Sequence, residues 1–261
     1  MKRTILLLLS AVLLAACIVS AITFVRQYRD AKNSEAEFAA LSQIAAQIRT
    51  GEKNRQVPMT VRETQHGEQA EPEAVTEAAY GELSAQNADY YGWVRIADSR
   101  IDYPVMYTPY DPDYYLTHSF KKETSKYGVP YLDSDCSQES NNLVIYGHNM
   151  KNGTMFGDLV NYTDREYCLS HPYIYLDTED TAAIYEVLAA FPFDADADTF
   201  CYNDYTDMNE ADFAKFMENV HIRQLYPTGA DAQYGDRLLT LSTCEYSYEN
   251  GRFVVVAKLV G

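Results

Sequence analysis

The sequence predicts a mainly β protein: a closed or nearly closed β-barrel preceded by a transmembrane helix. From Tyr80 onward the chain carries about eight short runs of β-branched, aliphatic and aromatic residues, separated by turn residues. Helices do not alternate regularly with these runs, which favours a barrel over an α/β sheet. Near the N-terminus, an uncharged apolar run of roughly 20 residues is long enough to cross a bilayer as a helix.

The composition fits a globular enzyme and changes near Tyr80. Of the 261 residues, 47% are hydrophobic, enough for a sizeable core, and the formal net charge of −17 argues against a nucleic-acid partner. Before Tyr80, nine basic and nine acidic residues cancel, so the whole acidic excess lies in the later part. We therefore expect a membrane anchor at residues 1–29, a helical arm and flexible linker at residues 30–79, and a catalytic domain at residues 80–261.

The apolar run, residues 5–25, is expected to be an uncleaved membrane anchor. Two basic residues precede it, and Arg26 and Arg29 follow it, so charge leaves its orientation open. As an alternative, Leu14-Ala-Ala-Cys17 resembles a lipoprotein cleavage box, and cleavage there would remove the segment and leave a lipidated Cys17. The apolar run continues past Cys17, however, and cleaved signals typically have shorter apolar cores. The pattern therefore favours the anchor.

A second helix is expected at residues 33–49. Ser34 is a candidate N-cap, and the apolar residues on one face are Phe38, Leu41, Ile44 and Ile48. This helix would be either a structural arm that packs on the catalytic domain or a solvated stalk, and the pattern leaves both open. Residues 50–76 are polar, with few large apolar side chains, which predicts a flexible linker.

The catalytic part is expected to contain eight strands with short helical connections. The expected strands are residues 92–96, 103–107, 129–132, 143–146, 173–176, 183–189, 237–244 and 252–260. Residues 156–162 are expected to form a short helix or turn. In the long connection at residues 191–235, Asp207-Met-Asn-Glu210 fits a capping box and precedes an apolar stripe at helical spacing. A helix there would form one wall of a substrate groove or cover a face of the barrel.

Three chemically reactive residues lie at predicted strand ends. Asn250-Gly251 tolerates positive φ and predicts a hairpin that places Cys244 beside Arg252. A nearby cation favours the thiolate, and a guanidinium offers several donors to an oxyanion. His148 follows the strand at residues 143–146 directly after Gly147, so it lies at a strand end. A cysteine, a histidine and an arginine at strand ends of one sheet predict a nucleophilic site.

The remaining cysteines and acidic residues predict no metal or cofactor site. The five cysteines show no CxxC pair and no metal-ligand spacing. Cys136, Cys168 and Cys201 are expected to be small buried hydrophobic residues. Asp194-Ala-Asp-Ala-Asp198 lacks the glycine and the distal glutamate of an EF-hand loop, so we expect a solvated acidic loop.

The motifs around the reactive residues resemble the sortase signature, specifically that of class B sortases of Gram-positive bacteria. The resemblance rests on Thr240-Leu-Ser-Thr-Cys244 followed by Arg252, and on Tyr146-Gly-His148-Asn-Met. It covers residues 89–261 and includes Met155-Phe-Gly-Asp-Leu159. It implies the eight-stranded sortase barrel, with N-terminal helices before it and a helix in the loop between the sixth and seventh strands.

The resemblance also implies a reaction and its partners. The chain would be a membrane-anchored cysteine transpeptidase of the thiol-peptidase type (EC 3.4.22), with its catalytic domain outside the cell. It would cleave an NPxT-like C-terminal sorting motif of surface proteins after the threonine. An amine of a peptidoglycan precursor or cross-bridge would then accept the cleaved protein from the thioester. Pilin polymerisation is an alternative use of the same chemistry.

The resemblance assigns roles to six residues. Cys244 would be the nucleophile, His148 the acid and base, and Arg252 the oxyanion donor. The residues implied to line the substrate groove are Tyr146, Ser242 and Glu245.

Alternatives outside this family are a different extracellular thiol hydrolase and a non-enzymatic adhesin or lipoprotein. An L,D-transpeptidase would place its histidine just before the cysteine, and a papain-like protease would place the cysteine first in chain order. Here the histidine is nearly a hundred residues away, and Cys244 comes last.

Overall fold

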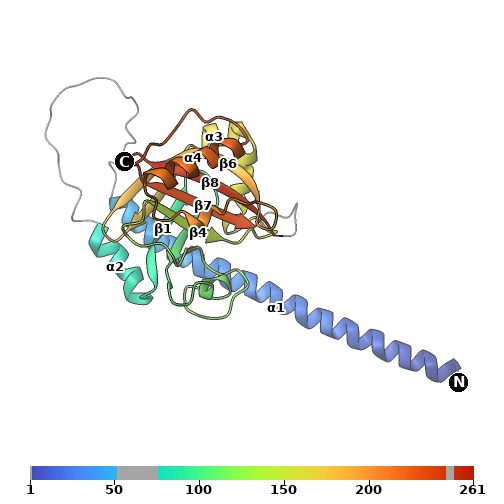
Figure 1. Ribbon diagram of the computed structural model, residues 1–261. Coiled ribbons are helices and arrows are strands. Elements are labelled where there is room, and N and C mark those ends of the chain that lie inside the picture. Colours follow the sequence, from blue (N-terminus) through green and yellow to red (C-terminus); the bar gives the residue numbers. More distant parts are fainter. Residues whose placement is uncertain (1, 52–75, 245–249) are drawn as a thin grey trace.

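In the computed structural model, eight strands close into a barrel within the part of the chain that the structure describes, residues 2–51, 76–244 and 250–261. The strand order around the barrel is β1-β2-β3-β4-β7-β8-β6-β5. This confirms the predicted fold class. Figure 1 labels five of these strands: β1, β4, β6, β7 and β8. The strands are β1 (Tyr90–Ile96), β2 (Asp102–Met106), β3 (Tyr131–Leu132), β4 (Asn142–Gly147), β5 (Tyr173–Thr178), β6 (Ala182–Asp194), β7 (Leu238–Cys244) and β8 (Gly251–Leu259).

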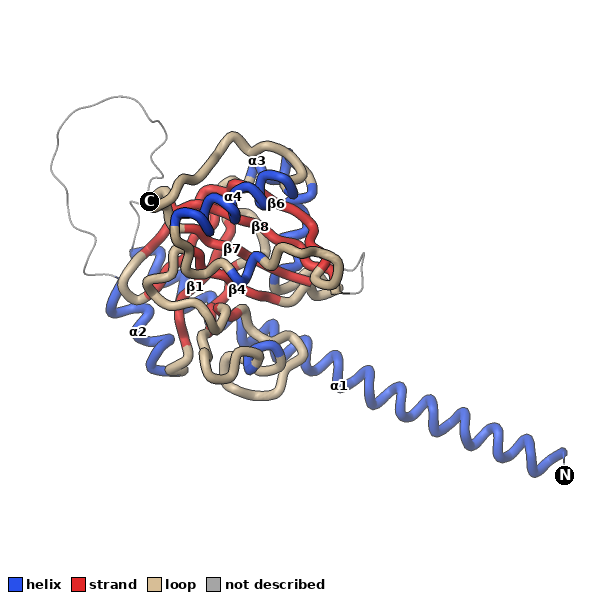
Figure 2. Tube along the Cα trace, in the orientation of Figure 1, coloured by secondary structure: helices blue, strands red, loops and turns tan. Residues whose placement is uncertain are grey.

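Helices are confined to the N-terminal segment and to the connections between strands, as Figure 2 shows. The α-helices are α1 (Lys2–Gly51), α2 (Thr76–Gln86), α3 (Arg165–Ser170) and α4 (Glu210–Arg223). Short 3-10 helices are η1 (Tyr114–Leu116), η2 (Phe156–Thr163) and η3 (Tyr202–Asp204). The expected short helix after the fourth strand is therefore η2, which continues into α3.

β4, β7 and β8 are neighbouring strands of the barrel. β4 and β7 pair in parallel from Asn142↔Leu238 to Gly147↔Thr243, and β7 and β8 pair antiparallel. Leu143, Val144 and Ile145 are all buried, because the neighbouring strands and the connecting segments cover both faces of β4. A continuous aliphatic run is typical of a strand in this position.

The N-terminal segment is one continuous helix, so the prediction of a separate helix starting at Asn33 was wrong. α1 runs from Lys2 to Gly51 without interruption. No glycine or proline occurs between these ends, so nothing in the sequence breaks the helix. Ser34 consequently lies inside the helix, where it is buried and does not act as an N-cap.

The C-terminal half of α1 packs on the barrel, which decides between the arm and the stalk in favour of the arm. The Phe38 and Tyr103 rings meet edge to face with their centroids 5.2 Å apart. Leu41 and Ala45 are buried, and Ser42 donates a hydrogen bond to the Asp102 carboxylate over 3.1 Å. The N-terminal half is apolar and long enough to cross a membrane by length and composition. Most of the predicted linker, residues 52–75, lies outside the described residues.

α2 lies before the first expected strand, where the family resemblance implied N-terminal helices, and its Leu83 is fully buried. α4 begins two residues later than the predicted capping box, whose N-cap would have been Asp207. Its N-cap is Asn209, whose side chain accepts hydrogen bonds from the backbone N–H groups of Ala211 and Asp212. Asparagine and aspartate are both preferred N-cap residues, so Asn209 can satisfy these free amides in place of Asp207.

Candidate active site

The β7–β8 hairpin places Cys244 and Arg252 side by side. They are the last pair of the β7–β8 register at that end of the barrel. Asn250, just before β8, has φ of 38°, a left-handed conformation that asparagine tolerates. This confirms the predicted hairpin pairing. Both side chains are half-buried, so the thiol and the guanidinium remain accessible from one face.

The parallel pairing of β4 with β7 brings His148 to the same end of the barrel. Gly147 is opposite Thr243, so His148 and Cys244 each follow the last pair in register. Two hydrogen bonds tie the strand ends together: Thr243 Oγ1 donates to the Gly147 carbonyl over 2.7 Å, and Asn149 Nδ2 donates to the Cys244 carbonyl over 3.0 Å. The backbone of the cysteine is thereby held by the residue that follows the histidine.

The His148 imidazole is held through one of its two nitrogens. Nε2 lies 2.8 Å from the Leu116 carbonyl oxygen. A carbonyl can only accept, so Nε2 carries the proton in this arrangement. In the neutral ring Nδ1 is then the acceptor nitrogen. The structure thus leaves Nδ1 as the nitrogen available for proton transfer.

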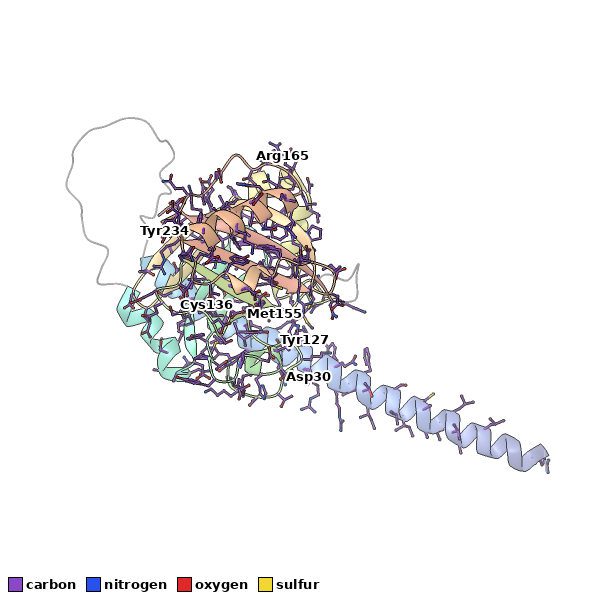
Figure 3. The ribbon with its side chains drawn as sticks, viewed as in Figure 1. Asp30, Tyr127, Cys136, Met155, Arg165 and Tyr234 are labelled. Atoms are coloured by element: carbon purple, nitrogen blue, oxygen red, sulfur yellow. The ribbon has the colours of Figure 1, made fainter. Side chains whose placement is uncertain are left out.

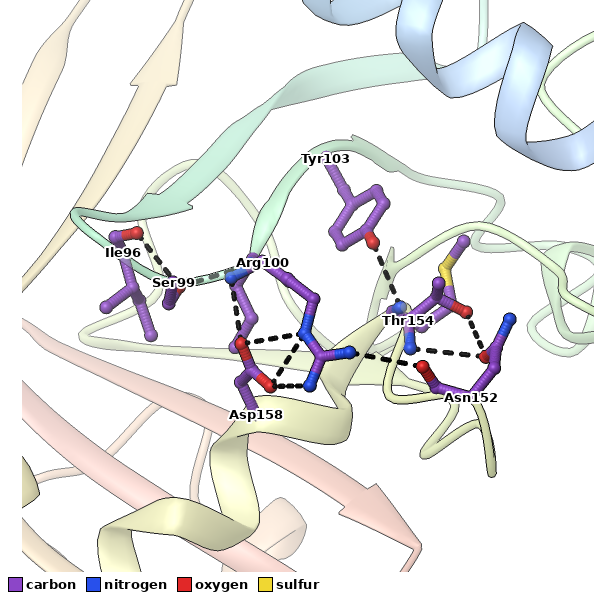
Figure 4. A network of polar contacts seen from close by, with 9 residues as sticks. Ile96, Ser99, Arg100, Tyr103, Asn152, Thr154 and Asp158 are labelled. Atoms are coloured by element: carbon purple, nitrogen blue, oxygen red, sulfur yellow. Dashed lines mark hydrogen bonds and ion pairs between the residues drawn. The ribbon is translucent and has the colours of Figure 1, made fainter.

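A polar network anchors the loop that carries His148 on its outer side (Figure 4). The Asp158 carboxylate accepts a hydrogen bond from the Arg100 backbone N–H over 2.8 Å. It also accepts one from Nη2 of the Arg100 guanidinium over 2.8 Å. Arg100 Nη1 also donates to the Asn152 carbonyl over 3.1 Å. The Tyr103 hydroxyl accepts from the Met155 N–H over 3.0 Å. The β1–β2 turn therefore fixes the far end of this loop.

The same loop is closed by tight backbone contacts. The Phe156 N–H donates to the His148 carbonyl over 2.8 Å, and Asn149 and Met155 form a β-bridge. Met155 has φ of 59°, an unfavourable conformation that surrounding contacts must maintain. A Cβ on Gly147 would lie 2.6 Å from the Phe156 ring, so only glycine fits there. His148 therefore sits on a loop with little freedom.

These strand ends surround a pocket of about 360 Å³. Its walls come from the ends of β4, β6 and β7, the start of β8, the segment before α4 and the segments before and after β3. The lining residues include Leu116, Tyr131, Asp133, Tyr146, His148, Phe193, Cys201, Tyr202, Ser242, Cys244 and Arg252. The pocket thus contains Cys244, His148 and Arg252 together with two of the three residues assigned to the substrate groove.

One half-buried and one buried tyrosine, Tyr146 and Tyr202, contribute polar groups to the pocket. The Tyr146 hydroxyl donates to the Asp133 carboxylate over 2.6 Å, and the Tyr202 hydroxyl lies 2.6 Å from Ser242 Oγ. Burial raises the pKa of Tyr202 to about 12 and also raises the pKa of Tyr146. Both phenols therefore stay neutral and act as hydrogen-bonding groups near neutral pH.

Several pocket residues carry no sequence motif, and one cysteine is less buried than expected. Tyr131, Asp133 and Tyr202 lie in no motif, and only the strand order brings them to the site. Glu245 lies outside the described residues. Cys201 was expected to be buried, but it is half-buried and lines the pocket, because it precedes η3 at the rim.

The helix α4 covers the barrel and does not line the pocket. Its stripe of Phe213, Phe216, Met217 and Val220 is buried in the core. Residues of the segment that precedes it, including Tyr202, form the wall instead. Of the two roles left open for this helix, the structure therefore favours the cover over a face of the barrel.

Comparisons with known proteins agree on the family. The Sortase domain model matches residues 94–260, which is more than half of the chain. The chain therefore belongs to the sortase family of transpeptidases. Its relatives narrow the class: it is 36% identical over 183 residues to the sortase B of Listeria monocytogenes, covering 69% of this chain and 73% of that protein. It is accordingly a class B member.

Solved structures of class B sortases have the same fold. Clostridium perfringens sortase B is 31% identical, with a TM-score of 0.64 over 70% of this chain and 100% of that one. A Staphylococcus aureus sortase B–substrate complex is 22% identical, with a TM-score of 0.73 over 89% of this chain and 98% of that one.

Proposed function

We propose that this chain is a membrane-anchored cysteine transpeptidase that cleaves an NPxT-like C-terminal sorting motif after its threonine and transfers the surface protein to a peptidoglycan amine. The observation that supports this best is the single pocket shared by Cys244, His148 and Arg252. Family membership supplies the transpeptidase class. Beyond that class, we propose the sorting motif, the accepting amine and the roles of the individual residues.

In the first half-reaction, Cys244 Sγ attacks the threonine carbonyl carbon of the sorting motif. The thiol proton of Cys244 passes to His148 Nδ1, the C–N bond breaks as the C–S thioester forms, and His148 gives that proton to the departing amine. Arg252 presents several N–H donors to the oxyanion, which forms beside it because the two residues are paired across the hairpin. The downstream peptide leaves, and the acyl group stays on sulfur.

In the second half-reaction, an amine of peptidoglycan precursor or cross-bridge attacks the thioester carbonyl. His148 removes a proton from this amine, an amide forms, and the Cys244 thiol is restored. No external energy source is required, because the thioester keeps the acyl group activated. The walls of the pocket must therefore admit two different partners in turn.

Tyr146, Ser242 and Glu245 are proposed to line the substrate groove. The structure favours Tyr146 for direct contact, since it is half-buried at the end of β4, whereas Ser242 is 1% exposed and lies against the Tyr202 hydroxyl. Tyr202 is then the group through which Ser242 acts on the substrate. The proposed location of the barrel is outside the cell, tethered by the apolar half of α1.

The test uses the full-length chain in detergent with a fluorogenic NPxT-like peptide and an amine acceptor. Cys244→Ala should abolish both cleavage and transfer, because no other thiol occupies its position at the end of β7. Cys17→Ser is the matched control, since Cys17 is exposed on α1 and should be dispensable for turnover. Wild-type turnover in Cys244→Ala would end the proposal.

A further inference from the structure

The apolar half and the barrel-packing half of α1 are separated by a very short stretch of helix. Every residue from Leu9 to Asp30 is exposed, whereas Ala31, Ser34 and Phe38 already contact the barrel. The apolar run ends at Val25. Five residues lie between Val25 and Ala31, so the helix takes six steps of about 1.5 Å, or about 9 Å, from the run to the first barrel contact.

This distance is close to the thickness of a headgroup layer. A bilayer of about 40–45 Å with a hydrocarbon core of about 30 Å leaves roughly 5–8 Å of headgroup region on each side. A tilt of the helix would only bring the barrel closer. Because α1 has no glycine or proline before Gly51, it lacks the residues at which helices usually bend. No bend is therefore expected between the apolar run and the barrel.

The side of the barrel that faces the N-terminal half of α1 is the side that carries the active-site loops. A cavity of about 180 Å³ lies between α1 and two loops, with Ala31 and Ser34 on one wall and Tyr127, Asn152 and Met155 on the other. Figure 3 shows Asp30, Tyr127 and Met155 together where α1 leaves the barrel. These loops are therefore the nearest parts of the barrel to the apolar segment.

Both loops connect directly to the catalytic residues. Met155 is bridged to Asn149, which donates to the Cys244 carbonyl. α1 also holds the loop that precedes Tyr127, since the Glu37 carboxylate accepts from the Lys121 N–H over 3.1 Å. That stretch of chain contains Leu116, the partner of His148. In Figure 1, the end of β7 and the N-terminal half of α1 lie on the same side of the barrel, and the C-terminus lies on the other.

We propose that the active-site end of the barrel faces the lipid headgroups, and that α1 is a rigid strut that holds it there. This rests on the membrane anchoring in the proposed function. The occupant of this face is the headgroup layer of the membrane that α1 crosses.

The test compares the full-length chain in lipid nanodiscs with a variant that carries seven extra residues, Ala-Glu-Ala-Ala-Lys-Ala-Ala, between Tyr28 and Arg29. This insertion extends α1 by about 10 Å and turns it by only about 20° from two full turns. Hydrogen exchange at residues 125–127 and 150–155 should be at least about threefold slower in the original chain than in the variant. Residues 178–181, at the opposite end of the barrel, should exchange equally in both.

Equal exchange at residues 125–127 and 150–155 in the two chains, or slower exchange at residues 178–181 in the original chain, would overturn the proposed orientation. As a second measurement, a sorting peptide attached to lipid by a short tether should be cleaved about tenfold more slowly by the variant. Cleavage of the same peptide in solution should be unchanged. If the original chain does not cleave the soluble peptide, the proposed function is refuted. The hydrogen-exchange comparison would still test the orientation of the barrel.

Discussion

The two elements that supply the site differ in how their positions are determined. The β7–β8 hairpin pairs Cys244 with Arg252 through neighbouring strands and a short turn. The loop of residues 148–155 places His148 through contacts with β7, with the β1–β2 turn and with the Leu116 carbonyl. The hairpin geometry is therefore local, whereas the histidine depends on the assembled barrel. Variants of the two elements should fail in different ways.

The largest expected contrast is between two thiols of the same barrel. Burial raises the pKa of Cys136 to about 12, so this thiol stays protonated at pH 8. Its thiolate fraction is then lower than that of an ordinary thiol of pKa about 8.5 by roughly a thousandfold. Cys244, half-exposed in the pocket, should be alkylated by iodoacetamide at least about a thousandfold faster than Cys136, as measured by peptide mass spectrometry. Similar rates for the two thiols would contradict an accessible nucleophile at the hairpin.

Arg252→Lys should lower kcat/KM by about 100-fold, because an ammonium cannot reproduce the planar fork of donors at a developing oxyanion. Peptide cleavage kinetics measure this. Arg237→Lys is the matched control, since Arg237 precedes β7 at the other end of the barrel, where it donates to the Gln138 carbonyl. If both substitutions have equal effects, Arg252 has no special role.

Gly147→Ala should displace the histidine loop. Its Cβ would lie 2.6 Å from the Phe156 ring, and relieving this clash should cost about 1–3 kcal/mol of unfolding free energy. We expect kcat to fall by about tenfold through misplacement of His148. Gly157→Ala is the control, because its Cβ would meet no atom closer than 3.5 Å. Denaturant unfolding and kinetics on both variants check the pair, and an unaffected Gly147→Ala enzyme would refute the tight placement.

The smallest effect is expected from the outer anchor of the loop. The Arg100 side chain is 59% exposed, so Arg100→Ala should cost little stability, yet it removes the contacts to Asp158 and Asn152. We expect kcat to fall by about fivefold with KM unchanged, because the positioning of His148 is loosened while the pocket wall remains. Arg100→Lys should restore part of the loss. The pH profile of kcat should also change shape, which a purely structural role would not produce.

Arg165→Ala is the control for the Arg100 variants, since Arg165 is similarly exposed and its ion pair with the neighbouring Glu166 spans a long 3.9 Å. It should leave kcat, KM and the pH profile unchanged. An Arg100→Ala enzyme that matches this control would show that the loop does not need its outer anchor.

The eight strands could be predicted from the sequence because each is a short run of β-branched and aromatic residues between turn residues. The stripe of α4 was equally visible, and all four of its predicted apolar residues are buried. The two predictions that failed for helices both concern N-caps. Ser34 lies inside a helix and Asn209 replaces Asp207 as a cap, because capping preferences are weak and several neighbouring residues can satisfy the same free amides.

The pocket was only partly predictable. Cys244 and Arg252 are placed by a local hairpin, and His148 stands in a motif after a strand. Tyr131, Asp133 and Tyr202 come from segments with no chemical signature, and their neighbours in space are far away in sequence. Tyr202, for example, meets Ser242 across 40 residues. Such a contact leaves no periodic pattern in the amino-acid sequence.

The sequence by itself determined the strands, the apolar segment and the identity of the reactive residues, because these depend on local propensity, length and side-chain chemistry. The tertiary structure alone decided that β4 lies parallel to β7, which brings His148 beside Cys244. It alone showed that α1 continues without a break into the barrel and leaves it on the active-site side. Both depend on packing between segments distant in the chain, and that packing is an outcome of the whole fold.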